Sequence, residues 1–269
     1  MLFVCFRPTA DYIYHMLSAA QCGALYYIAV SVPAALDAPQ DMLTYYLAME
    51  ELFRGDDAPG NAAKHQRLYS SAFRFPVTPQ SHVEFYNRYR PFREEAIAVF
   101  SVLRSGWQEY ESRFLAPNEA LCCSVCNALE NLPGFFTLPS AWAKASGITM
   151  QLCFTALLCA AMENGPQAID VSPEKDVFFA GTKPERLAAL ISHEYGIYLL
   201  RKAMPDVLTG SMEEYPYLEA LAEYYNRRAF PGYPCSGFHE GLISACDLPA
   251  LTPKERYLRL REQRVALNH

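Results

Sequence analysis

Residues 181–204 read GTKPERLAALISHEYGIYLLRKAM and predict a long helix. Apolar residues recur in it at helical spacing. Thr182, followed three residues later by Glu185, predicts a capping box at its start. Three short apolar runs come before the helix, separated by Gly, Pro, Asn and Asp, and they predict strands at 148–159, 167–172 and 176–181. We therefore expect a small sheet that leads directly into this helix.

A His-Glu pair lies in the middle of this predicted helix. In the HExxH zinc motif a second histidine follows four residues after the first, so that two imidazoles lie one turn apart and hold one zinc ion. The glutamate beside the first histidine then acts as a base toward the metal-bound water. His193 and Glu194 are kept here, whereas Ile197 takes the place of the second histidine. The pair alone therefore predicts only part of the motif.

The acidic segment YPYLEALAEYYNRR at 215–228 extends the pattern. Its element LEALAEY resembles the EGLAEY segment that carries the third zinc ligand in glutamate-type zincin metallopeptidases, with Ala220 in place of the usual glycine. In this match Glu219 stands at the ligand position and Tyr224 completes the segment. Together with the predicted strands and the His-Glu helix, the resemblance covers about residues 147–228.

The resemblance to zincin metallopeptidases implies a particular site. Its cofactor is zinc, if the protein holds one at all, with His193 and Glu219 as metal ligands and Glu194 as the catalytic base. The strand just before the His-Glu helix lies at the edge of the sheet. A cleft for a peptide or protein segment surrounds the metal position, and the residues expected there are Tyr195, Ile197, Glu223 and Tyr224.

Ile197 leaves two ligands where catalytic zinc usually has three from the protein. We therefore expect a zinc-metallopeptidase-like protein with a degenerate metal site and little or no peptidase activity. One alternative is a non-catalytic peptide-binding, protein-binding or scaffold protein that keeps the cleft. Another is an active peptidase in which His239, from the second His-Glu pair at 239–240, replaces the missing ligand. The plainest alternative is a helix with ordinary polar residues, in which Glu223 pairs with Arg227.

The first 146 residues carry no family signature and predict mostly helices. One helix is expected to begin at Thr9, a second to end at Gly55, and others to fit 63–73, 80–89, 92–115 and 118–130. Near the C-terminus, Thr252 and Glu255 repeat the capping-box pattern. The expected fold is a mainly helical α+β protein. A helical part at 1–146 is followed by a zincin-like part at 147–269, and the two can form one compact unit.

Composition indicates which classes of partner and which surroundings the protein has. The formal net charge of -6 argues against a general nucleic-acid binder. Residues 16–36 are apolar, but tyrosines interrupt them and a basic start is missing, so we interpret them as a buried helix rather than a membrane span or signal peptide. Nine cysteines in a chain of this length indicate reduced thiols in a cytoplasmic protein. Three of them are expected to be mostly buried in one helix, namely Cys122, Cys123 and Cys126.

Overall fold

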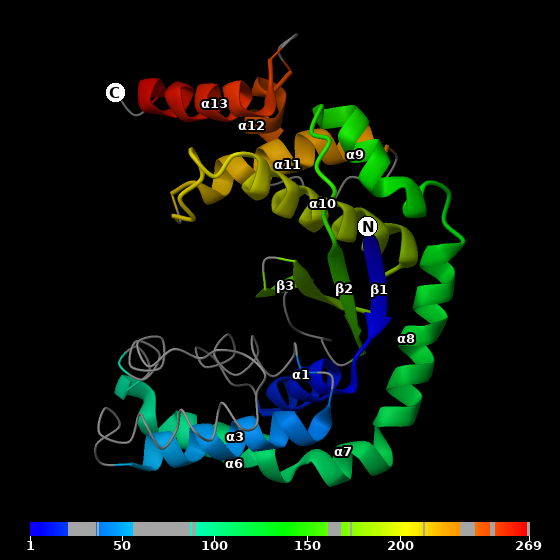
Figure 1. The fold of residues 1–269 in the computed structure, drawn as a ribbon, viewed down its shortest axis with the longest axis vertical. Coiled ribbons are helices and arrows are strands. Elements are labelled where there is room, and N and C mark those ends of the chain that lie inside the picture. Colours follow the sequence, from blue (N-terminus) through cyan, green and yellow to red (C-terminus); the bar gives the residue numbers. More distant parts are fainter. Residues whose placement is uncertain are drawn as a thin grey trace.

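The computed structural model describes residues 1–20, 36, 38–55, 87, 90–160, 168–172, 174–211, 213–231, 240–247 and 251–267. Several predictions lie wholly or largely outside these residues, namely the helices at 63–73 and 80–89, the apolar stretch at 16–36 and the ligand His239. The described part is a mainly helical α+β protein, as predicted (Figure 1). None of its helices is both long enough and apolar enough to cross a membrane.

A four-stranded sheet occupies the middle of the molecule in the order β1, β2, β4, β3. β1 (Leu2–Phe6) pairs in parallel with β2 (Phe154–Cys159), which pairs in parallel with β4 (Lys175–Phe179). β3 (Ala168–Ser172) is antiparallel to β4 and forms one edge. The three predicted strands are therefore present, whereas β1 comes from a region for which the sequence predicts no strand. The strand that leads into the His-Glu helix is β4, which is interior and not the edge strand expected from the resemblance.

The interior strands β2 and β4 are buried on both faces, since successive side chains point to opposite faces and most of them are buried. In β2, Leu157 and Cys159 belong to the hydrophobic core formed with the N-terminal helices. Ala156 and Leu158 belong to the core formed with the C-terminal helices. The sheet is thus a layer shared by two groups of helices, and it takes strands from both sides of residue 146. A division of the chain at that residue stays a prediction.

The first group of helices lies below the sheet in Figure 1 and consists of α1 (Pro8–Ala20), α3 (Pro39–Arg54), α6 (Arg93–Ser105), which follows the short η2 (Arg90–Phe92), and α7 (Trp107–Arg113). α3 ends at Gly55, as predicted. The single helix predicted at 92–115 is instead divided at Gly106. A Cβ there would lie 2.7 Å from Cε of Met16, so the glycine allows α1 to pack closely against the break.

α8 (Leu115–Glu130) runs alongside β1 and connects the two groups of helices (Figure 1). It confirms the helix predicted at 118–130. Its three cysteines are free thiols, but their burial differs, because Cys122 is buried, Cys126 is half-buried and Cys123 is exposed. The prediction of a buried thiol is therefore confirmed for Cys122 and wrong for Cys123. A helix that covers the sheet with only one face leaves the opposite face in solvent.

The second group of helices surrounds α11 (Tyr215–Ala229), which contacts each of the others. These are α9 (Leu138–Ser146), which follows the short η3 (Phe135–Thr137), the His-Glu helix α10 (Pro184–Ala203), α12 (Glu240–Ala245) and α13 (Pro253–Leu267). α10 and α11 lie side by side above the sheet (Figure 1). This pairing brings the His-Glu pair next to the acidic segment.

The two predicted capping boxes have different outcomes. At α13 the box is confirmed, since the backbone N–H of Thr252 donates to Glu255 Oε2 at 2.7 Å and the Glu255 N–H donates to Thr252 Oγ1 at 3.3 Å. At α10 it is wrong. The residue that precedes the helix is Lys183, without a side-chain cap, and the N–H of Thr182 donates to the carbonyl of Phe179 in a turn.

Candidate functional site

The position of α10 is fixed by one tryptophan, which contacts the helix on both sides of the His-Glu pair. A Cβ at Gly196 would lie 2.0 Å from Cη2 of the fully buried Trp142, so only glycine leaves room for the indole ring. The indole Nε1 donates a hydrogen bond to Ser192 Oγ at 3.0 Å. These contacts lie one residue before His193 and three residues after it. They therefore set the rotation of α10 about its axis and with it the direction of the imidazole.

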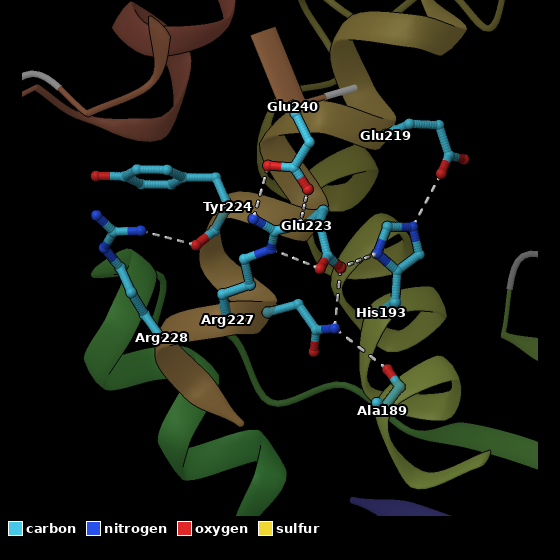
Figure 2. Close-up of polar contacts among 9 residues, drawn as sticks. Ala189, His193, Glu219, Glu223, Tyr224, Arg227, Arg228 and Glu240 are labelled. Carbon is cyan, nitrogen blue, oxygen red and sulfur yellow. Dashed lines mark hydrogen bonds and ion pairs between the residues drawn. The ribbon is translucent and has the colours of Figure 1, made fainter. Parts of the chain in front are cut away.

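The imidazole of His193 lies between two carboxylates of α11. Its Nε2 is 2.9 Å from Glu219 Oε2, although 26 positions separate the two residues. Its Nδ1 is 3.3 Å from Glu223 Oε2 (Figure 2). Glu219 and Glu223 are four residues apart, so they share one face of α11, and that face is turned toward α10. The structure thus brings together the two residues expected to be metal ligands and one of those expected around them.

Glu223 is the more deeply buried of the two carboxylates, at 1% exposure. Its Oε1 accepts a hydrogen bond from Arg227 Nε at 2.8 Å, which confirms the i,i+4 pair predicted within this helix. Its Oε2 also accepts from Asn226 Nδ2 at 3.2 Å. The same amide nitrogen donates to the backbone carbonyl of Ala189 at 3.2 Å and so joins α11 to α10. Glu223 is therefore held in place from several directions.

Arg227 extends the hydrogen-bonded chain to a residue that the sequence does not indicate. Its Nη1 and Nη2 donate to the two carboxylate oxygens of Glu240, the first residue of α12 (Figure 2). In the second His-Glu pair, the sequence indicates a role only for His239, as the replacement ligand, and none for Glu240. Nothing in the local spacing predicts that Glu240 contacts Arg227, because the two lie on different helices.

The two carboxylates beside His193 determine whether its imidazole is protonated. Burial by itself lowers the pKa of His193, but hydrogen bonds to Glu219 and Glu223 outweigh it and raise that pKa to about 10. An ionised carboxylate only accepts hydrogen bonds, so both ring nitrogens donate together only in the imidazolium form. Burial raises the pKa of Glu223, but its hydrogen bonds reverse this and leave that pKa lowered. At neutral pH the site is thus a buried cation between carboxylates.

The remaining predicted site residues lie in other surroundings. Ile197 is buried, at 6% exposure, as part of the second hydrophobic core. Glu194 is partly exposed beside His193. The ring of Tyr195 packs against Trp142 and Phe154, which makes it a core residue.

Tyr224 was expected around the metal position but faces the other way. Its ring lies 3.6 Å below the Arg228 guanidinium carbon, and Arg256 of α13 lies 5.0 Å from the same ring. It also meets the ring of Tyr225 edge to face. In Figure 2 its side chain points away from His193. We conclude that Tyr224 serves the packing of α11 against the C-terminal helices.

The donor atoms at this site do not fit catalytic zinc. Such an ion usually has three protein ligands. His193 and Glu219 offer two donors, and the third place in the motif is held by the apolar Ile197. Across the described part of the chain, no group of three His, Cys, Asp or Glu side chains is arranged to hold a metal ion. His239, the alternative ligand, lies outside the described residues.

Comparison with known proteins identifies no relative. The chain matches no family model, no curated protein and no solved structure.

Proposed function

We propose that this chain contains a zincin-type metallopeptidase domain whose metal site is degenerate, and that it has little or no zinc-dependent peptidase activity. The observation that carries the proposal is the contact between His193 and Glu219. These two residues are the metal ligands implied by the resemblance, and their side chains meet at 2.9 Å from two different helices. This contact is the one that the resemblance to zincin metallopeptidases predicts between the two helices.

The geometry around His193 gives further support. In a tetrahedral zinc site with bonds of about 2.0–2.1 Å, two ligand atoms lie roughly 3.3 Å apart. The 2.9 Å between Nε2 and the Glu219 oxygen is slightly shorter, as a direct hydrogen bond requires. Zinc-bound histidines also commonly donate their second ring N–H to a carboxylate. Glu223 takes that place at Nδ1.

Ile197 is the reason for proposing that the site is degenerate. It lies one turn after His193, where the motif has its second histidine, and its buried side chain offers no donor atom. Two protein ligands hold zinc weakly and leave the rest of its coordination to solvent. The protonated imidazole then supplies the positive charge between the two carboxylates in place of the metal.

Zinc binding by the unmodified chain and by Ile197→His tests the proposal. We expect purified unmodified protein to contain no stoichiometric zinc by elemental analysis. Ile197→His should bind zinc at least about tenfold more tightly in calorimetric titration, because it adds a third donor on the same helix face. Adding Glu219→Gln to Ile197→His is the matched control and should remove the gain. Tight, stoichiometric zinc in the unmodified protein would contradict the proposal and would favour His239 as the missing ligand.

A second candidate function is the binding of a peptide or protein segment without hydrolysis. The sheet edge favours it. Among the described strands β3 pairs only with β4, and we infer that an added strand pairs with the backbone N–H and C=O groups on its other side. The opposite edge differs, because α8 packs against β1. Extended peptides should therefore slow amide exchange at 168–172 but not at Leu2–Phe6. Equal protection of both edges, or of neither, would rule this binding mode out.

A further inference from the structure

Arg227 lies at the centre of a hydrogen-bonded chain that starts at His193 and leaves the site. Its Nε donates to Glu223 Oε1, and Glu223 Oε2 is the atom that faces His193 Nδ1. Its two terminal nitrogens reach both oxygens of Glu240 on α12. One guanidinium thus joins a buried carboxylate beside His193 to a carboxylate whose side chain is 54% exposed on another helix (Figure 2).

From this geometry we infer that Arg227 and Glu240 form a latch through which α12 positions the imidazole of His193. Arg227 is the positioning residue, and Glu240 is the anchor that holds its guanidinium. The inference rests on the proposed function only in taking His193 and Glu219 as the site. It concerns how the site is held in place, whether or not a metal ion binds there.

Because the guanidinium of Arg227 is planar, its contact with Glu240 fixes its orientation. Its N–H groups point in fixed directions, so a carboxylate that accepts from both terminal nitrogens fixes the plane of the whole group. Nε must then point at Glu223 along one line, and the contact is 2.8 Å. A surface ion pair by itself contributes little to stability, so the importance of Glu240 lies in this orientation and not in its charge.

The orientation passes from Arg227 to His193 through the two oxygens of Glu223. With Oε1 held by Arg227, Oε2 is left directed at Nδ1 of His193 and at the amide of Asn226. When the Arg227 donor at Oε1 is displaced, this buried carboxylate turns toward the donors that remain around it, because each hydrogen bond lost at a buried acceptor is costly. Its Oε2 then moves off the line to Nδ1. Displacement of α12 therefore loosens the imidazole, and coupling of this kind is reciprocal.

The test is the exchange rate of the ring N–H protons of His193, measured by NMR at neutral pH on the full chain with labelled histidine. Glu240→Gln and Arg227→Lys should each speed exchange of the Nδ1 proton about tenfold relative to the Nε2 proton, since one charge-assisted contact is lost. Asp247→Asn is the matched control. It breaks the neighbouring Arg228–Asp247 pair, which has the same type of contact at 2.8 Å outside the chain of bonds, and should change neither rate.

Comparing the two ring protons distinguishes positioning from general loosening. The inference is overturned if Nδ1 exchange is unchanged in Glu240→Gln, or if both ring protons speed up equally. Should Arg227→Lys fail to fold, Glu240→Gln decides alone, because it alters an exposed side chain. Zinc titration tests the proposed function separately and involves no latch variant. A failure of either can therefore be told from a failure of the other.

Discussion

Raising the pH from 6.5 to 10 should remove the contribution that His193 makes to the stability of this protein. Its pKa in the folded chain is raised to about 10, mainly by the carboxylates of Glu219 and Glu223 acting against burial, and its ordinary value is 6.5. A group whose pKa is raised by folding stabilises the protein fully below the unfolded value, and this contribution is lost as the pH rises toward the folded value. The slope is up to about 1.4 kcal/mol per pH unit, and the whole window corresponds to at most about 5 kcal/mol.

Urea unfolding of the metal-free chain between pH 6 and pH 10 measures this loss, with His193→Gln as the reference. Tyrosines, cysteines and the amino terminus titrate in both proteins, so the difference between their free energies of unfolding isolates the imidazole. We expect that difference to fall with rising pH. If the free energies of unfolding of the two proteins change in parallel with pH, His193 is not an imidazolium held between two carboxylates. If the variant does not fold, the ring carbon shifts of His193 in the unmodified chain give its pKa directly, and a value near 6.5 has the same consequence.

Two further substitutions test the packing of the fold, one next to the site on α10 and one on α1. Gly196→Ala places a methyl group 2.0 Å from the buried ring of Trp142, so we expect a net loss of about 2 kcal/mol in urea unfolding despite the better helix propensity of alanine. An unchanged midpoint would contradict this packing. Asp11→Asn should cost about 3 kcal/mol, because the buried carboxylate accepts from the side chains of Tyr110 and Asn118 and an amide removes the charge. A loss below about 0.5 kcal/mol would show that the hydrogen bonds of Asp11 contribute little to the stability of the fold.

Within the part of the chain that the structure describes, most helices and three of the four strands could be predicted because their signals are local. Hydrophobic period, a C-terminal glycine such as Gly55 and short apolar runs each depend on a few neighbouring residues. β1 could not, because its five residues have no alternation of polar and apolar side chains that sets them apart. It becomes a strand by pairing with β2, more than 150 positions away. Such a partner is a property of the folded chain and not of the segment.

The two capping boxes show how a single residue decides a helix start. Proline is the first helical residue of both helices, at Pro184 in α10 and at Pro253 in α13. Its fixed φ and missing N–H suit that position. In the order Thr-Pro-Lys-Glu the threonine directly precedes the proline and caps the helix. In the order Thr-Lys-Pro-Glu the cap position falls on Lys183, and Thr182 is one residue too early. The threonine-to-glutamate spacing is the same in both, so the proline is the better predictor.

The sequence predicts the contacts of a site carboxylate only where its partner lies a few residues away in the same helix. Helical spacing predicts that Glu223 forms an ion pair with Arg227, and the structure confirms that pair. The same spacing places Glu223 on one face with Glu219, so whatever brings one carboxylate to His193 brings the other. Only the resemblance to a known site, and not the spacing, indicated that α11 would lie against α10. Because a carboxylate has two oxygens, Glu223 serves its neighbour in the helix with one and the imidazole across the helix interface with the other.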